Sequence, residues 1–246
     1  MVKNIKLTIA YDGTNYHGWQ TQLSKSTIQE TIEKAISVIT KSKADLVGSG
    51  RTDSGVHALG QTANFIAETK IDTAKITFAL NANLPRDIRI LNSEDVPLEF
   101  NSRFDAHKKT YMYQIYNDRI LIPFYCNYSY FVPNLLNFEK MECAIKLLVG
   151  THDFKGFMAA GSDVKTTVRT IYDVKLTRNN EMIRLYVTGS GFLYNMVRII
   201  AGTLVDIGKG TKDVSCIENA LKTCDRTTLG HTAKAEGLFL KEVFYN

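Results

Sequence analysis

Residues 48–57 combine groups that can do chemistry with a backbone that can turn sharply. The stretch reads Gly-Ser-Gly-Arg-Thr-Asp-Ser-Gly-Val-His and places the carboxylate of Asp53 two residues after the guanidinium of Arg51. Glycine adopts backbone angles that other residues avoid, and three of these ten residues are glycine. The stretch therefore predicts a tight loop that holds one carboxylate and one guanidinium close together.

The glycine spacing argues against two common phosphate sites. It matches neither G-x-G-x-x-G nor G-x-x-x-x-G-K-[ST], so a nucleotide-binding phosphotransferase is not indicated. An aspartate beside an arginine stays ionised, because the positive charge favours the charged form, and an ionised carboxylate suits nucleophilic or base chemistry. The residue types also allow a second interpretation, in which Asp53 only caps its own backbone in an Asx turn.

A second informative stretch covers residues 189–202. Its latter part has the pattern of a mostly apolar helix that contains a single arginine, Arg198. Burying an unpaired guanidinium is costly, so we expect Arg198 to meet a carboxylate or the solvent of a cleft. The four cysteines form no CxxC pair and do not cluster with histidines, so neither a zinc site nor a disulfide scaffold is indicated.

Hydrophobic periodicity predicts the elements that position these two stretches. Ile5, Leu7 and Ile9 alternate with polar residues and predict a strand over 3–12, and a capping box at 27–30 starts a helix that runs to about residue 41. Strands over 44–47 and 61–65 flank the glycine-rich loop. Further patterns predict helices over 72–82 and 138–149 and after Asp213, strands over 88–91, around 109–116 and over 238–245, and a hairpin over 170–188.

These elements predict an α+β fold in which helices pack against one face of a largely antiparallel sheet. We place a boundary near residue 105, so that residues 1–104 carry the Asp53 loop and residues 105–246 form the second half. Two segments mix basic and aromatic residues. Residues 16–20 fit a loop whose rings pack on the core better than a surface on which bases stack, and residues 103–113 also fit an edge strand.

Composition limits the partners and the location. The 246 residues carry a net charge of +5, which fits a polyanionic partner but also fits an ordinary solvated surface. The first residues lack the apolar run of a signal peptide, and no stretch reaches the roughly 18 apolar residues of a membrane span. We expect a cytoplasmic protein without a membrane partner.

Residues 48–58 resemble the G-x-G-R-T-D-x-G-V-H-A signature of the tRNA pseudouridine synthase A family. Ser49 and Ser54 stand where alanine is common in that family, which leaves the backbone freedom of the loop intact. The resemblance continues in family order along the chain, through residues 11–14, 18–20, 81–85, 103–104, 109–113, 150–154, 191–198 and 232–238.

The resemblance implies a pseudouridine synthase fold, with two fused α/β halves flanking a central cleft, and an isomerase that needs no cofactor or metal. It implies conversion of uridine to pseudouridine in the tRNA anticodon stem-loop, at positions 38 to 40, by a homodimer with the tRNA across both subunits. A non-catalytic tRNA-binding module or chaperone is the alternative. The intact Asp53, Tyr111 and Arg198 argue against that alternative.

The resemblance also assigns roles to single residues. Asp53 matches the nucleophilic aspartate, and whether it attacks the sugar or acts as a base stays open. Tyr111 matches the tyrosine that stacks on the target base and is a candidate for removing the C5 proton. Arg198 matches the basic residue that pairs with the aspartate, and Arg51 matches the arginine that holds the site open when uridine is flipped out.

Overall fold

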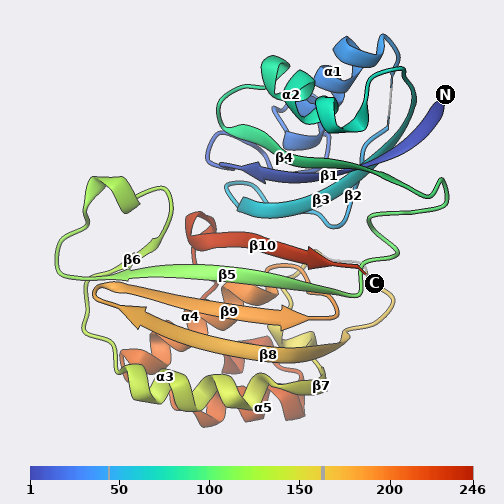
Figure 1. Ribbon diagram of the computed structural model, residues 1–246. Helices are drawn as coiled ribbons and strands as arrows, with labels where there is room; N and C mark the ends of the chain where they lie inside the picture. The colour runs from blue at the N-terminus through green and yellow to red at the C-terminus, as the bar shows by residue number, and fades with distance from the viewer. Residues whose placement is uncertain (44, 162–163, 246) are drawn as a thin grey trace. The chain divides into compact units, whose positions relative to one another are not determined.

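The computed structural model describes residues 1–43, 45–161 and 164–245 and divides into two compact units (Figure 1). The first unit comprises Met1–His107 together with Phe239–Asn246, and the second comprises Lys108–Leu238. From the sequence we expected halves of 1–104 and 105–246. In the structure the last residues belong to the first unit, because the C-terminal strand pairs there with a strand that is far away in sequence.

The first unit is a sheet with two helices on one side of it (Figure 1). Its strands lie in the order β4, β1, β3, β10, and β2 also pairs with β3. The β10–β3 pair is parallel and the others are antiparallel. The elements are β1 (Val2–Tyr11), α1 (Ile28–Thr40), β2 (Val47–Gly48), β3 (His57–Glu68), α2 (Thr73–Asn83), β4 (Ile88–Val96) and β10 (Leu238–Phe244).

Strand β1 forms where the alternating pattern predicts it. Ile5, Leu7 and Ile9 are each 0% exposed, while Lys6 and Thr8 between them are only partly buried. The strand pairs on one side with β3 and on the other with β4, so its backbone groups are satisfied along both edges. It therefore lies at the centre of the first unit's core.

Helix α1 begins at Ile28 as predicted, but the predicted capping box is wrong. The N-cap residue Thr27 makes no side-chain cap hydrogen bond, and its buried Oγ1 has no hydrogen-bond partner. The first N–H groups of the helix bond to another segment instead: Ile28 N–H donates to the Gly18 carbonyl at 3.2 Å, and Gln29 N–H donates to the Trp19 carbonyl at 2.9 Å. Contacts with a distant segment, rather than a side-chain cap, satisfy the start of this helix.

The second unit is a four-strand antiparallel sheet in the order β5, β9, β8, β7, with β6 paired parallel to β5. Helix α3 packs on α4, and α4 packs on β5. Its elements are β5 (Lys108–Asn117), β6 (Tyr130–Val132), α3 (Phe138–Ile145), β7 (Gly150–Asp153), β8 (Val168–Asn179), β9 (Met182–Gly189), α4 (Met196–Gly208) and α5 (Ser215–Thr223), with short 3₁₀ turns η1 (Pro123–Tyr125), η2 (Lys146–Leu148), η3 (Lys155–Phe157), η4 (Arg226–Thr228) and η5 (Ala235–Gly237).

Most expected elements are present, with some differences. The hairpin turns at Asn180, which has a φ of 52°, and α4 continues past residue 202 to Gly208. Short strands β6 and β7 were not predicted, because three or four residues give no readable period. Residue 44, the start of one expected strand, lies outside the described residues, and the strand before the loop is Val47–Gly48.

The edge-strand interpretation of residues 103–113 is wrong. Strand β5 has a hydrogen-bonded neighbour on each side in the strand order and pairs antiparallel with β9 along most of its length. Beyond the segment, at Ile115–Asn117, it also pairs parallel with β6. The α+β class with a mostly antiparallel sheet is confirmed. Over the described residues, none of the helices has the length and apolar character needed to cross a membrane.

The core of the first unit gives a direct test of the fold. Leu7→Ala removes a fully buried side chain from the central strand and leaves a cavity, so we expect the free energy of unfolding to fall by about 2–5 kcal/mol. Thr8→Ala, on the partly exposed face of the same strand, is the control and should cost much less. Urea denaturation measures both; equal losses would contradict this assignment of the two faces.

Candidate active site

Asp53 lies in the loop between β2 and β3, and the loop turns tightly just after it. The Val56 N–H donates to the Asp53 carbonyl at 3.1 Å, and Gly55 has a φ of 76°, which favours glycine. The Asp53 side chain is half-buried and that of Arg51 is exposed. The expected sharp turn is therefore present, and Asp53 stands at its start.

Strand β3 anchors the first part of the loop. The Ser49 N–H donates to the Thr62 carbonyl at 2.8 Å, and Ser49 Oγ donates to Gln61 Oε1 at 2.6 Å. The same Gln61 side chain donates through Nε2 to the Gly50 carbonyl at 2.9 Å. Ser49 thus contributes a buried hydrogen bond that an alanine at this position would lack.

Residues 11–19 hold the loop from the other side. The Tyr11 hydroxyl and Thr52 Oγ1 are 2.7 Å apart, and the Trp19 N–H donates to the Thr52 carbonyl at 3.0 Å. The Tyr16 carbonyl accepts from the Gly55 N–H at 3.3 Å and from Ser54 Oγ at 3.2 Å. Residues on both sides of Asp53 in sequence are therefore fixed through contacts with a segment about forty positions earlier.

Trp19 packs in the core, as the preferred interpretation of residues 16–20 expected. Its side chain is 3% exposed, and a Cβ added to Gly48 would lie 2.6 Å from its ring. Gly18 has a φ of 86°, and a Cβ there would lie 2.6 Å from the Thr52 carbonyl oxygen. Glycine at both positions lets the two segments approach each other closely.

His57, at the end of the signature, is buried beside Asp12. His57 Nδ1 lies 3.2 Å from Asp12 Oδ1 and 3.1 Å from the Gly13 N–H, and the ring stacks on Phe239 with centroids 4.7 Å apart. A Cβ on Gly13 would overlap the Val56 carbonyl oxygen. His57 therefore ties the end of the loop, the β1 turn and β10 together within the first unit.

The other two expected site residues lie in the second unit. Tyr111 is on β5 opposite Val187 of β9, and its buried ring meets the Phe192 ring edge-on, with centroids 5.1 Å apart and planes at 83°. Phe192 comes from the loop that precedes α4. The contact orients the Tyr111 ring.

Arg198 lies in the first turn of α4 and is partly buried. Its Nε donates to the Ala233 carbonyl at 2.8 Å, and its Nη1 donates to Asn195 Oδ1 at 2.8 Å. Asn195 caps the helix with a φ of 59°, in the left-handed region that asparagine tolerates. We expected Arg198 to meet a carboxylate or the solvent of a cleft, and the Ala233 carbonyl and the Asn195 amide were not foreseen. The pairing of Arg198 with a carboxylate stays a prediction.

Within each unit the expected residues share local surroundings. Arg51 and Asp53 occupy one loop of the first unit; Tyr111 and Arg198 lie on β5 and α4 of the second, two elements that pack together. Sequence reasoning missed Thr52, Tyr11 and Ala233 as supports. Their only signal was that each belongs to one of the motif blocks noted above.

The comparisons with known proteins point to one family. A family model described as tRNA pseudouridine synthase matches residues 7–105 and 144–246. The tRNA pseudouridine synthase A 2 of Clostridium tetani is 49% identical over 248 residues and is covered over 100% of both chains. The tRNA pseudouridine synthase A proteins of Acetivibrio thermocellus and Caldicellulosiruptor bescii are 47% and 48% identical, each covering 99% of this chain and 100% of the relative.

The contact between Gly48 and Trp19 can be tested through fluorescence, because Trp19 is the only tryptophan in the sequence. Gly48→Ala places a Cβ against the ring, so we expect a red-shifted emission and a loss of about 1–3 kcal/mol in stability. Gly191→Ala is the matched control, since its Cβ would meet only Arg169 side-chain atoms at 3.7 Å. An unshifted spectrum in Gly48→Ala would contradict the packing.

Proposed function

Because the chain belongs to the tRNA pseudouridine synthase family, we propose that it isomerises uridine to pseudouridine in the anticodon stem-loop of tRNA, at positions 38 to 40. The observation that carries the proposal is the signature loop with Asp53 at a rigid turn, together with full-length relatives named tRNA pseudouridine synthase A. No observation favours a tRNA-binding module without activity.

In this proposal Asp53 starts the reaction. The C1′–N1 glycosidic bond of the flipped uridine breaks, the uracil turns in the pocket, and a C1′–C5 bond forms. The C5 proton is lost and N1 gains one, so substrate and product are isomers. A half-buried carboxylate on an anchored loop suits this chemistry, because little reorganisation is needed when charge develops at the sugar. Attack on the sugar and action as a base both remain open roles for Asp53.

The other roles follow the resemblance. Tyr111 stacks on the target base and is the candidate for removing the C5 proton; its ring already has one face-to-edge partner in Phe192, which supports a fixed stacking surface. Arg198 pairs with Asp53 and keeps it ionised. The exposed Arg51 holds the site open when uridine leaves the stem.

The net charge of +5 supports a tRNA partner, since lysine and arginine gain affinity by releasing counterions from phosphates. We also propose that the protein is a cytoplasmic homodimer. Support for the dimer comes from residues 120–135, a segment that exposes several apolar side chains although Ser129 and Val132 within it are buried. It exposes Phe124 at 84% and Leu135 at 86%, along with Ile120, Ile122, Tyr125 and Tyr128. Exposed apolar side chains gathered in one segment are typical of contact surfaces.

Asp53→Asn tests the nucleophile. We expect the variant to keep its fold and tRNA binding but to lose pseudouridine formation by roughly 10⁴-fold, because the amide has no charge to attack or to take a proton. Asp45→Asn, which changes an exposed carboxylate earlier in the chain of the same unit, is the control and should stay active. Pseudouridine mapping on unmodified tRNA measures both.

Appreciable pseudouridine formation by a folded Asp53→Asn protein would contradict the assignment of Asp53 as the nucleophile. Wild-type modification only outside positions 38 to 40 would contradict the proposed substrate site.

Phe124→Asp tests the dimer. We expect the wild type to sediment as a dimer at micromolar concentration and the variant to shift toward the 27.7 kDa monomer, because a buried unpaired carboxylate opposes association. The control is Phe78→Asp, which alters a phenylalanine that is 75% exposed on α2 of the first unit. A monomeric wild type would contradict the dimer, and a fully dimeric Phe124→Asp would move the interface elsewhere.

A further inference from the structure

Arg198 is joined to one segment of the second unit through both its main chain and its side chain. The Ala233 N–H donates to the Arg198 carbonyl at 3.0 Å, and the Ala233 carbonyl accepts from Arg198 Nε at 2.8 Å. Ala233 belongs to residues 226–234, which we call the strap. The position of the Arg198 guanidinium therefore depends on the position of Ala233 in the strap.

The strap runs along α4 in the opposite direction to the helix. Residues 230 and 231 contact Thr203 and Asp206, and residue 233 contacts Arg198. A Cβ on Gly202 would overlap the His231 carbonyl oxygen, and one on Gly230 would overlap the Asp206 carboxylate. The strap and the helix thus leave no room for a side chain at these two positions, so a shift of one element displaces the other.

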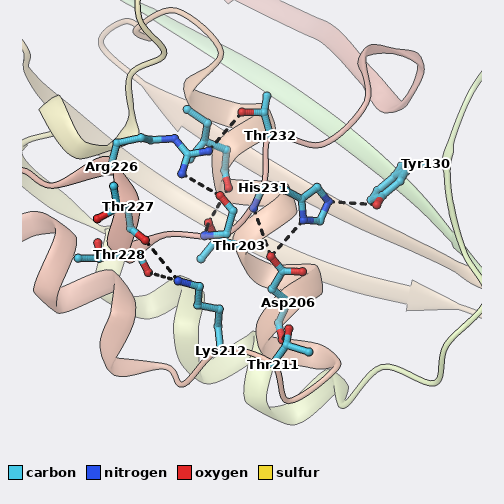
Figure 2. Close-up of polar contacts among 12 residues, drawn as sticks. Tyr130, Thr203, Asp206, Thr211, Lys212, Arg226, Thr227, Thr228, His231 and Thr232 are labelled. Carbon is cyan, nitrogen blue, oxygen red and sulfur yellow. Dashed lines mark hydrogen bonds and ion pairs between the residues drawn. The ribbon is translucent and has the colours of Figure 1, made fainter.

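The Arg226 side chain makes two hydrogen bonds within the strap (Figure 2). Its Nη1 donates to the Gly230 carbonyl at 2.8 Å and its Nη2 to Thr232 Oγ1 at 3.3 Å. The side chain is partly buried, and this burial lowers the pKa of the guanidinium. A planar guanidinium that reaches two points in one segment fixes the spacing between them, which a flexible ammonium does not do. These two points lie on either side of His231 and lead directly to Ala233.

Two further anchors fix the strap to α4. Thr203 Oγ1, fully buried, accepts from the Gly230 N–H at 3.1 Å while donating to the Ile199 carbonyl at 2.7 Å. Asp206 Oδ2 accepts from the His231 N–H at 3.2 Å and lies 3.1 Å from His231 Nδ1. His231 Nε2 lies 3.0 Å from the Tyr130 hydroxyl, and Figure 2 draws this contact as a dashed line.

The far end of the strap reaches the strand that carries Tyr111. The Lys234 carbonyl accepts from the Tyr113 hydroxyl at 2.7 Å, and Tyr113 stands two residues after Tyr111 on β5. Burial raises the pKa of Tyr113 well above its usual value, so the hydroxyl keeps its proton and donates. The strap therefore hydrogen-bonds to Arg198 and to Tyr113, which lies on the same strand as Tyr111.

We propose that the strap is the positioning element of Arg198 and that Arg226 is a positioning residue acting through it. By fixing Gly230 and Thr232, Arg226 sets the Ala233 carbonyl, and this carbonyl holds Arg198 Nε. In this proposal Arg226 acts through Ala233 rather than on a reacting atom. The catalytic consequence rests on the proposed function, whereas the effect on the Arg198 side chain does not.

The first experiment reads the Arg198 side chain without any activity measurement. In ¹⁵N-labelled full-length protein, the Arg198 Nε–H resonance is assigned by its absence in Arg198→Lys. We expect Arg226→Met, which keeps the chain length but removes both donors, to shift this resonance and speed its exchange with water. Arg178→Met is the matched control: Arg178 donates through Nε to the Asn180 carbonyl at 3.1 Å, away from the strap. It should leave the resonance unchanged.

The second experiment measures turnover on unmodified tRNA. We expect Arg226→Met to lower kcat by about tenfold or more with KM changed by less than about twofold, since a displaced catalytic group affects the transition state more than binding. Arg226→Lys should recover part of the loss of kcat, because lysine keeps the positive charge and can donate to one of the two acceptors in the strap.

A different anchor of the strap provides an independent pair of variants. Thr203→Val is nearly isosteric but removes the acceptor for the Gly230 N–H, whereas Thr203→Ser keeps the hydroxyl. We expect Thr203→Val to shift the Arg198 Nε–H resonance and lower kcat in the same direction as Arg226→Met, and Thr203→Ser to restore both. This pair keeps the test valid if Arg226→Met does not fold.

The outcomes separate the two proposals. An unchanged Arg198 Nε–H resonance in folded Arg226→Met and Thr203→Val overturns the positioning role, as does an equal loss of kcat in Arg178→Met. A shifted resonance with a selective loss of kcat supports it. A shifted resonance in a protein whose wild type forms no pseudouridine supports the positioning of Arg198 and instead contradicts the proposed function.

Discussion

The hydrogen bond between the Tyr11 hydroxyl and Thr52 Oγ1 fixes the residue before Asp53 to the end of strand β1. Tyr11 is 4% exposed, and burial raises the pKa of its hydroxyl, so the group stays neutral and the bond is shielded from water. Ser49, Gln61 and Trp19 extend this attachment to both sides of the loop. The carboxylate therefore stands on a loop that is fixed like a core element, although it has no regular structure.

Both units hold an irregular segment in place through glycine contacts and polar side chains. In each, an irregular segment that carries or supports a site residue lies against a buried element, and glycine permits the close approach: Gly48 beneath Trp19 in the first unit, Gly202 beneath the strap in the second. Polar side chains then satisfy the backbone groups that no strand or helix would satisfy. The loop that carries Asp53 and the guanidinium of Arg198 are thus each held by hydrogen bonds within their own unit. Groups that are positioned in advance in this way suit the proposed reaction.

Local patterns predicted much of the fold. The alternation at residues 5–9 and the apolar spacing from residue 28 predicted β1 and α1 nearly to the residue, because strand and helix periods are set by the chain itself. The capping box at Thr27 and the edge-strand interpretation of β5 failed for a common reason. Whether a hydroxyl finds a partner and whether a strand edge is paired depend on residues far away in sequence.

The sequence by itself determined the family, the signature loop and the residues expected to do the chemistry, because these follow from residue type and order. Only the tertiary structure decided what holds them. Tyr11 and Thr52 are 41 positions apart, and Arg198 and Ala233 are 35 apart, so neither contact leaves a periodic trace in the chain. Such contacts exist because packing brings two backbones within reach, and packing is a property of the folded chain as a whole.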